Sequence, residues 1–266
     1  MENGVVLFIV DAQKDFADPK GSLYVNGADD SCKRTAAFIR NNIDTIDHIV
    51  LTMDTHRVNA IFHPTWWKMA DGGNVPPLTS IRLSDIDSGK YYTDKDPEWS
   101  RAYVEALEKQ GGVHTVWPQH CVIGTWGYSI DDEILSAVHE WEIKRGGVHG
   151  AEYVSKGANP KVEHFGAFQA EVSIPTDPST QANMSLINRL KEFGTILICG
   201  QARNVCVLQS VKQMLKLSPA GMGSKMVLLE DCMDDVPNFP TTADEDYAKA
   251  SEAGVSFTKS SLWTNG

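Results

Sequence analysis

The feature that most constrains the fold is an unbroken apolar run of six residues, Val5–Val10, that ends at Asp11. A strand that is apolar on both faces is typical of the centre of a parallel sheet covered by helices on both sides. Further short strand patterns follow, at Ile46–Met53, Glu152–Ser155, Thr195–Cys199, Lys225–Leu229 and Val255–Phe257. Between the strands lie helical patterns, at Asp29–Ile43, around Trp99–Lys109, from about Tyr128 to Val138, and at Thr180–Phe193, Cys206–Leu217 and Thr241–Ala253. The alternation predicts an α/β fold: a doubly wound, roughly six-stranded parallel sheet with helices on both faces.

We interpret residues 1–266 as a single domain with an insertion at about 57–112, where the alternation of strands and helices is broken. Because few core-forming residues stand out in this segment, we expect it to lie over the active edge of the sheet rather than to form a separate domain. Loops on that edge usually form lids and pockets. His63, Trp66 and Trp67 could line such a pocket, or could pack the insertion onto the body.

The composition excludes several classes of protein. With 24 Lys and Arg against 35 Asp and Glu, the formal net charge is −11, which argues against a nucleic-acid partner. The longest apolar runs are too short to cross a bilayer, and the N-terminus does not resemble a signal peptide. Five scattered cysteines indicate no disulfide framework. We therefore expect a cytoplasmic protein, forming a homo-oligomer, whose partner is a small molecule rather than a nucleic acid or a membrane.

Cys206 is a candidate nucleophile. It follows the apolar strand Thr195–Cys199 and a turn at Gly200, and it begins a helical pattern. This arrangement presents a side chain at the carboxyl edge of a parallel sheet. At the first turn of a helix, the partial positive charge of the helix N-terminus would lower the pKa of the thiol and favour the thiolate.

Acidic residues end two of the predicted strands. Asp11 follows the first strand, at the edge where open α/β sheets bind ligands, although a turn or capping role is the alternative. We favour the functional role because the residues after Asp11 read as a loop rather than a helix. Asp54 and His56 follow the second strand, and two residues that are two apart on extended chain point the same way, so both can reach one ion. His120 could supply a third ligand, with Cys121 as a rival that is more often a core residue.

Lys156 follows the third strand and could hold a thiolate or a proton relay, although most lysines are solvated surface groups. The chain contains neither a G-x-G-x-x-G after the first strand nor a G-x-x-x-x-G-K-[ST]. It therefore offers no support for dinucleotide or nucleoside triphosphate chemistry.

Five motifs along the chain resemble, in order, those of the isochorismatase-like cysteine hydrolases and, within them, the nicotinamidases: FIVDAQKDF with the following GSL, MDTH, WPQHCVIGTWG, VSKG and ICGQARNVCV. The resemblance implies that Asp11, Lys156 and Cys206 are the catalytic aspartate, lysine and nucleophile. It also implies that Asp54, His56 and His120 bind a divalent metal, with Zn²⁺ preferred and Fe²⁺ or Mn²⁺ as alternatives.

The activity implied by the resemblance is that of a metal-assisted cysteine amidohydrolase. Such an enzyme releases ammonia from a small carboxamide, such as nicotinamide, through a thioester intermediate. The backbone N–H groups of Ala202 and Cys206 would form the oxyanion hole, and the bound metal would orient the substrate. Phe16, Trp66 and Phe165 are candidates to stack on a flat ring in the substrate pocket.

The chain departs from the family pattern at three places. Arg203-Asn204 replaces the usual T-D before the nucleophile, D-T-H-R replaces D-W-H-P, and the segment 57–112 is longer than in compact members. The family's cis peptide bond would fall at Gln201–Ala202. Three alternatives stay open: an amidase for another amide, ureide or carbamoyl compound, a vinyl ether hydrolase, which would need no thiol, and a catalytically inactive binding relative.

Overall fold

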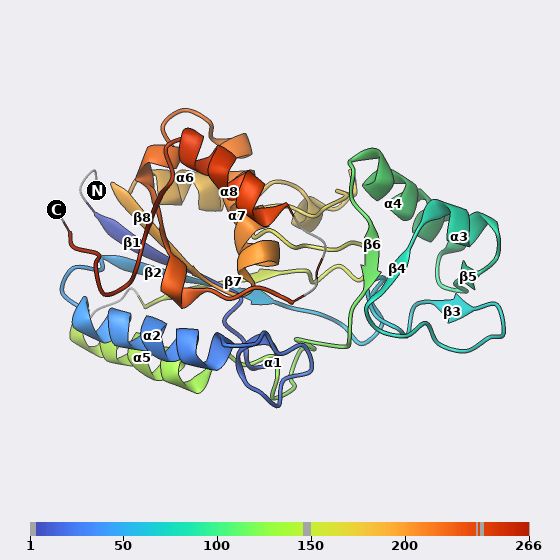
Figure 1. Cartoon of the computed structure of the whole chain (residues 1–266), viewed down its shortest axis with the longest axis horizontal. Coiled ribbons are helices and arrows are strands. Elements are labelled where there is room, and N and C mark those ends of the chain that lie inside the picture. The colour runs from blue at the N-terminus through green and yellow to red at the C-terminus, as the bar shows by residue number, and fades with distance from the viewer. Residues whose placement is uncertain (1–3, 146–149, 238, 240–241, 266) are drawn as a thin grey trace.

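A computed structural model describes residues 4–145, 150–237, 239 and 242–265. Its main sheet has six parallel strands in the order β10-β9-β8-β1-β2-β7 (Figure 1). The strands are β1 (Val5–Val10), β2 (His48–Asp54), β7 (Glu152–Lys156), β8 (Thr195–Gly200), β9 (Met226–Leu229) and β10 (Ser256–Thr258). All six predicted strands are present, and the predicted fold class is confirmed. Every residue of β1 is buried, as its apolar run requires of a central strand.

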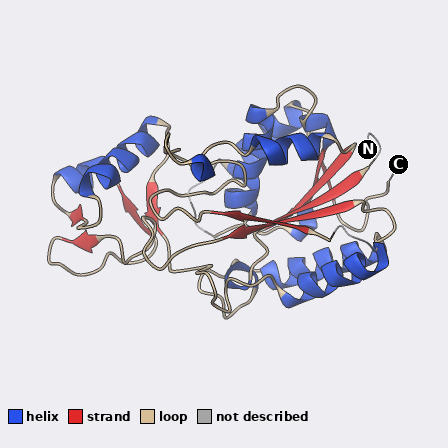
Figure 2. Ribbon diagram, turned by 180° about the vertical axis from the view of Figure 1, so that it is seen from behind, coloured by secondary structure: helices blue, strands red, loops and turns tan. Residues whose placement is uncertain are grey.

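Helices cover both faces of this sheet (Figure 2). One layer holds α2 (Ala28–Asn41) and α5 (Asp132–Arg145), and the other holds α6 (Met184–Lys191), α7 (Leu208–Leu217) and α8 (Ala243–Glu252), as Figure 1 shows. Apolar side chains of both layers meet the strands in one large core, which includes Trp141 of α5 and Met214 of α7.

The structure departs from the predicted helices by more than two residues at three places. Gln13, Asp15 and Phe16 do not stay in a loop: a short helix, α1 (Lys14–Ala17), follows Gln13. The helix expected from Tyr128 begins at Asp132, because Asp131 Oδ1 accepts the backbone N–H groups of the first turn. The helix expected from Thr180 begins at Met184, after a 3-10 turn over Pro178–Thr180 (η1) and an N-cap at Asn183.

The segment 57–112 and the strand that follows it form a lobe at one end of the molecule (Figure 1). Its elements are β3 (Lys68–Met69), β4 (Thr79–Ile81), α3 (Leu83–Asp87), β5 (Tyr91–Tyr92), α4 (Pro97–Lys109) and, beyond the insertion, β6 (His114–Val116). This lobe has its own hydrophobic cluster, with Phe62, Trp67 and Tyr103 almost completely buried in it. The expectation that few core-forming residues lie in the insertion is therefore wrong.

The strand register places polar residues from distant parts of the chain at one edge of the sheet. Asp54 pairs with Lys156 at the ends of β2 and β7, and Val10 pairs with Gly200 at the ends of β1 and β8. Asp11 continues directly from β1 in a left-handed conformation, with φ 45°. Since the carboxyl ends of adjacent parallel strands meet, these side chains converge without any contribution from the lobe.

Gly200 allows β8 to end close against β1. Its φ is 117°, and a Cβ atom there would lie 2.0 Å from the carbonyl oxygen of Val10. We expect Gly200→Ala to lower the free energy of unfolding by about 3 kcal/mol or more, because two paired strands would have to separate. Gly221→Ala, at φ 74° with no described atom within 4 Å of the new Cβ, should cost only about 1–2 kcal/mol. Urea unfolding measures both; equal losses would contradict the close approach of β1 and β8.

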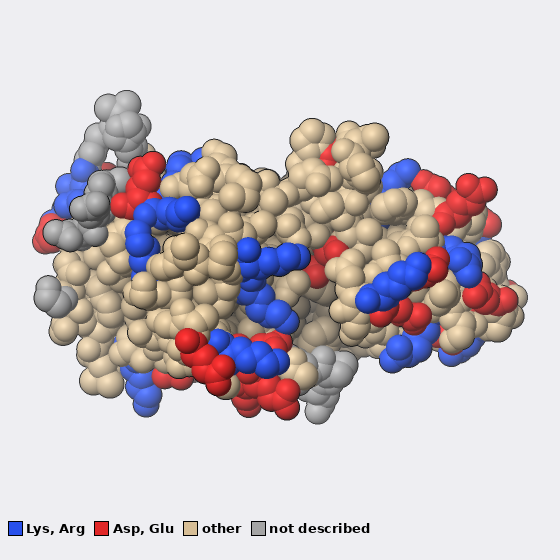
Figure 3. Space-filling view, turned by 90° about the horizontal axis from the view of Figure 1, so that it is seen from above, with Lys and Arg blue, Asp and Glu red and all other residues tan. Residues whose placement is uncertain are grey.

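The surface mixes charges of both signs. On the face that Figure 3 shows, Lys and Arg side chains lie in small groups beside Asp and Glu, with uncharged surface between them. Within the described ranges, no helix combines the length and the apolar character needed to cross a bilayer.

Candidate active site

Lys156, at the end of β7, lies at the centre of a buried polar cluster. Its Nζ is 2.8 Å from Asp11 Oδ2, 2.5 Å from Asp54 Oδ1 and 3.9 Å from Cys206 Sγ. It also donates a hydrogen bond to the carbonyl oxygen of His164, 2.7 Å away. The structure thus brings together the three residues that the sequence indicates for catalysis, and the lysine touches both the acid and the thiol.

The charges in this cluster depend on one another. Burial raises the pKa of Asp11 to about 6, although Lys156 opposes the shift. Burial alone would lower the pKa of Lys156, but the carboxylates of Asp11 and Asp54 hold it well above its usual value. Burial would also raise the pKa of Asp54, but Lys156 and the nearby histidines hold it below the usual range. At neutral pH the cluster therefore contains a charged lysine between two carboxylates.

Cys206 lies in a π-helical turn, Arg203–Val207, that precedes α7. Burial raises the pKa of its thiol well above the usual value, and the nearby charge of Lys156 only partly opposes this. The expectation of a thiol pKa lowered by a helix N-terminus is therefore wrong. Cys206 is largely buried, and the first turn around it is not a regular α-helix, so desolvation outweighs the helix dipole. In this environment the resting sulfur is a thiol, and it needs a base.

The expected cis peptide bond is present between Gln201 and Ala202. It lies in the connection between β8 and the turn that carries Cys206, and Ala202 and Cys206 both line the pocket described below. Their proposed role as oxyanion donors stays a prediction.

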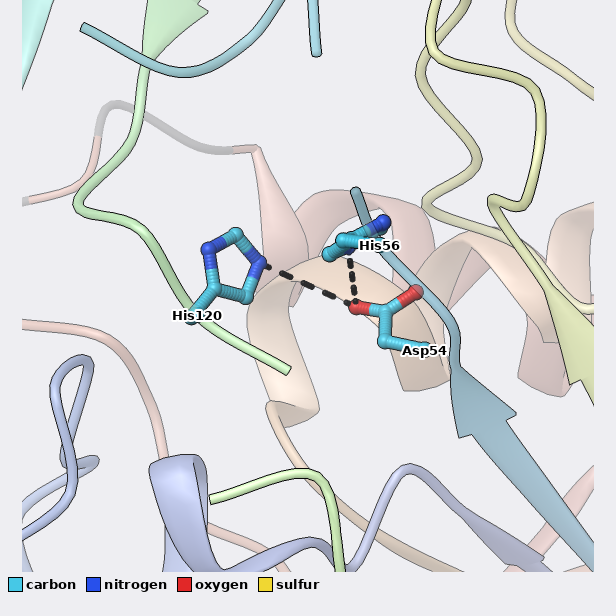
Figure 4. A group of neighbouring side chains, drawn as sticks. All are labelled: Asp54, His56 and His120. Carbon is cyan, nitrogen blue, oxygen red and sulfur yellow. Dashed lines mark ion pairs between the residues drawn. The ribbon is translucent and has the colours of Figure 1, made fainter. Parts of the chain in front are cut away.

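Asp54, His56 and His120 form a compact group of potential metal ligands (Figure 4). Asp54 Oδ2 lies 3.3 Å from His56 Nε2 and 3.9 Å from His120 Nε2. Each imidazole is oriented by a backbone carbonyl at its other nitrogen: His56 Nδ1 is 3.2 Å from Gly157 O, and His120 Nδ1 is 2.7 Å from Pro118 O. Outer partners of this kind fix metal-binding histidines.

The chemistry of this group fits a divalent cation. The Nε2 atom of His56 is buried, and apart from its 3.3 Å contact with Asp54 Oδ2 it has no hydrogen-bond partner among the described residues. Burial, together with the neighbouring His56, holds the pKa of His120 well below its usual value, so its imidazole is neutral at physiological pH, as a metal ligand must be. One carboxylate and two imidazoles form a three-ligand set that suits zinc and leaves coordination positions open.

His63 lies beside this group rather than in the substrate pocket that the sequence suggested. Its ring centroid is 5.8 Å from that of His56 and 5.5 Å from that of His120. Its Nδ1 faces the carbonyl oxygen of Arg57, and its buried Nε2 has no hydrogen-bond partner in the part of the chain that the structure describes.

An apolar pocket opens next to the polar cluster around Lys156. The lining residues are Phe16, Leu23, Val25, Asp54, Trp117, His120, Glu163, Phe165, Ala202, Val205, Cys206 and Val236. Phe16 and Phe165 therefore lie where the sequence placed them. Trp66 does not line the pocket: it is buried in the lobe's own cluster, and its indole N–H donates to Ser100 Oγ at 3.0 Å. The adjacent Trp67 is buried in the same cluster, so both tryptophans pack inside the lobe rather than line the pocket.

Glu163 is a pocket residue that the sequence analysis missed. Burial raises its pKa to about 7, and its carboxylate accepts the backbone N–H of His164 at 3.0 Å. Nothing in its spacing distinguishes it from a surface glutamate, because it follows a loop rather than a strand end.

Gln13 clamps the end of β2. Its amide nitrogen donates to Asp54 O at 2.8 Å and to Tyr128 O at 2.9 Å, and its carbonyl accepts the N–H of Asp54 at 2.7 Å. These bonds hold the backbone of Asp54, a candidate metal ligand, from both sides.

No protein-family model matches the chain. The curated nicotinamidase of Saccharomyces cerevisiae is 25% identical over 238 residues, which cover 88% of this chain and 89% of that protein. The solved structure of yeast nicotinamidase bound to the inhibitor nicotinaldehyde has a TM-score of 0.66 and 19% identity, and covers 96% of this chain and 99% of that one.

Two further solved structures match over nearly the whole chain. The Acinetobacter baumanii nicotinamidase pyrazinamidase has a TM-score of 0.62 and 21% identity, with 98% of both chains covered. The pyrazinamidase of Pyrococcus horikoshii in complex with zinc has a TM-score of 0.56 and 20% identity, with 96% of this chain and 98% of that one covered. These structures show a common fold, and the yeast sequence adds a match along the same length. The chain is thus similar to nicotinamidases in both sequence and fold over nearly its whole length.

Proposed function

We propose that the protein is an amidohydrolase that releases ammonia from a small flat carboxamide, such as nicotinamide, through a thioester on Cys206. The observation that carries the proposal is the position of Lys156, which contacts both Asp11 and the sulfur of Cys206 beside an apolar pocket. A base, a nucleophile and a cation within reach of one another are the parts that nucleophilic acyl transfer needs.

The residues divide the reaction between them. Asp11, whose pKa of about 6 leaves it mostly ionised at pH 7, takes the thiol proton as the sulfur of Cys206 attacks the carbonyl carbon. The C–S bond forms, the C–N bond breaks, and the proton goes to the leaving nitrogen, which departs as ammonia. Water then cleaves the thioester, so that the carboxylic acid and the thiol are regenerated.

Two groups stabilise charge during these steps. Lys156 keeps Asp11 ionised before the attack and stabilises negative charge on the sulfur. The backbone N–H groups of Ala202 and Cys206 bind the developing oxyanion, a contribution of about 2.7–4 kcal/mol per donor in enzymes of this type.

A divalent metal would be held by Asp54, His56 and His120, with His63 adjacent. When bound, the metal supplies Lewis-acid chemistry that orients a ring nitrogen or another donor of the substrate. The zinc in the Pyrococcus horikoshii pyrazinamidase supports this assignment.

The pocket lining favours an aromatic substrate. Phe16, Trp117 and Phe165 present flat apolar surfaces, and the rings of Trp117 and Phe165 meet edge to face at 6.2 Å. Such walls suit a heteroaromatic ring better than a linear ureide. The names of the relatives point to nicotinamide and pyrazinamide as the first compounds to try.

Ammonia release from nicotinamide, pyrazinamide, a ureide and a carbamoyl compound, with and without a chelator, tests the proposal. We expect turnover of the two aromatic amides, with loss after chelation and recovery after Zn²⁺ is added back. Faster turnover of a linear compound would replace the proposed substrate class. Absence of ammonia from every compound, with metal present, would contradict the proposed enzyme and favour a binding relative.

The role of Asp11 as base predicts an acid limb in kcat/KM near pH 6. The ionised form is active, and its pKa is raised, so activity is present above about pH 6 and is lost as the pH falls through it. Thr52 Oγ1 donates to Asp11 Oδ1 at 2.6 Å and lowers this pKa. Thr52→Val should therefore move the limb upward by about one pH unit. Thr52→Ser, which keeps the hydroxyl, is the control. If kcat/KM of the unaltered protein, Thr52→Val and Thr52→Ser falls at the same pH, Asp11 is not the base.

A further inference from the structure

A second cavity reaches Lys156 and has no lining residue in common with the catalytic pocket. Its volume is about 500 Å³. It lies between the end of β7, the 3-10 turn η1 and the start of α6, and includes Ser155, Lys156, His164, Ser179, Gln181 and Asn183. The catalytic mechanism assigns no task to this space.

The lining favours a negative ligand. The polar lining side chains are three serine hydroxyls, two amides, the imidazole of His164 and Lys156. No Asp or Glu occurs among the described lining residues, although Asp177 beside them accepts the hydroxyl of Ser179 at 2.8 Å, which leaves the other two serines as hydroxyl donors. The first turn of α6 opens onto the cavity at Asn183, Met184 and Ser185. Asn183 Oδ1 caps the N–H of Leu186, and the helix N-terminus adds partial positive charge.

His164 supplies the second observation that points to a ligand. Its side chain lines the cavity, the residue is only 6% exposed, and Nδ1 is buried with no hydrogen-bond partner among the residues that the structure describes. A buried polar nitrogen left unpaired costs about 1–3 kcal/mol. Because the backbone carbonyl of His164 accepts a hydrogen bond from Lys156, a ligand on this imidazole would also hold a residue that positions the catalytic lysine.

We propose that this cavity is a binding site for a small oxyanion, held by His164 Nδ1, the hydroxyl of Ser185 and the first turn of α6. A tetrahedral anion such as inorganic phosphate offers several acceptor oxygens to hydroxyl, amide and imidazole donors that converge from three segments. The proposal does not depend on the amidohydrolase activity, because binding is measured without substrate.

Titration calorimetry of the full chain with inorganic phosphate, at constant ionic strength set with NaCl, tests the site. We expect one phosphate per chain with a Kd of about 1 mM or tighter. Acetate in a parallel titration separates a preference for phosphate from a preference for carboxylates. If acetate binds more tightly than phosphate, the site prefers carboxylates, and the choice of phosphate is overturned.

Three variants locate the binding. His164→Leu removes the ring nitrogen and should weaken phosphate about tenfold or more. His164→Asn places a polar atom near the position of Nδ1 and should stay within about threefold of the unaltered protein. The control is His139→Gln, an exposed histidine on α5 that is not a lining residue, which should have no effect.

Two results would overturn the proposal. One is the absence of phosphate binding, and the other is binding that His164→Leu leaves unchanged. Binding that survives in His164→Leu but is lost in His56→Ala would place the anion at the metal site instead. If His164→Leu does not fold, as judged by circular dichroism, Ser185→Ala takes its place with an expected loss of about threefold or more.

Discussion

Replacing Cys206 by alanine is expected to reduce ammonia release by about 10⁴-fold or more while leaving the fold intact. Alanine removes the sulfur that forms the thioester, and the remaining donors and metal ligands can only bind the amide. The change is small in volume and lies at the wall of the pocket, so the free energy of unfolding should fall by no more than about 1–2 kcal/mol. Steady-state kinetics on nicotinamide and a urea melt measure the two effects.

Cys121→Ala is the matched control for this experiment. Cys121 is also buried, follows the metal-site residue His120 and is the rival thiol. Burial raises the pKa of its thiol well above the usual value, with Asp54 and Asp15 adding to the shift, and its N–H donates to Asp15 Oδ2 at 2.7 Å. Loss of its sulfur should change kcat by no more than a few-fold. Full activity in Cys206→Ala, or loss of activity only in Cys121→Ala, would show that Cys206 is not the nucleophile.

A mass-spectrometric trap makes the test independent of kinetics. With substrate and rapid acid quench, the unaltered protein should carry an acyl adduct on the peptide that contains Cys206. The adduct should be absent from Cys206→Ala and present in Cys121→Ala. An adduct on any other residue would contradict the thioester proposed here.

Much of the polar cluster could be predicted from the sequence because parallel strands align their carboxyl ends. Asp11, Asp54 and Lys156 each follow a predicted strand, and the observed register pairs Asp54 with Lys156 directly. A position at the end of a predicted strand therefore indicates which residues lie together in the folded chain, whereas the number of residues between them does not. His120 has no such positional signal, because it follows a short strand of the lobe, β6, rather than a strand of the main sheet. From the residues alone it was therefore only a possible third ligand, with Cys121 as a rival, until the resemblance added its motif.

The features that could not be predicted depend on packing between distant segments. Trp66 looked like a pocket wall, but Ser100 of α4 binds its indole and places it in the lobe's cluster. The thiol pKa of Cys206 follows from how completely the surrounding segments exclude water, which a helix-start pattern does not reveal. Glu163 becomes a pocket residue only because its loop returns to the sheet edge beside His56 and Lys156.

Replacing Lys156 by methionine is expected to affect both catalysis and stability. Without the Lys156 ammonium, the carboxylates of Asp11 and Asp54 would be buried near each other without its positive charge. The pKa of Asp11 would rise further, because Lys156 is the group that opposes the effect of burial on this pKa. Asp11 would then be largely protonated at pH 7 and unable to accept the thiol proton. We expect kcat/KM to fall by about 10³-fold, and stability at neutral pH to fall by about 3–5 kcal/mol, as when one partner is removed from a buried ion pair.

The dependence of this loss on pH separates the electrostatic explanation from a packing defect. Protonation of Asp11 relieves the unpaired charge, so the stability gap between Lys156→Met and the unaltered protein should narrow from pH 8 to pH 5. Lys161→Met is the control: Lys161 Nζ lies 2.5 Å from Asp96 Oδ2, but its side chain is 46% exposed. An exposed pair of this kind contributes less than about 1 kcal/mol. A gap that is the same at both pH values, or an equal loss in Lys161→Met, would show that Lys156 does not act by holding the buried carboxylates ionised.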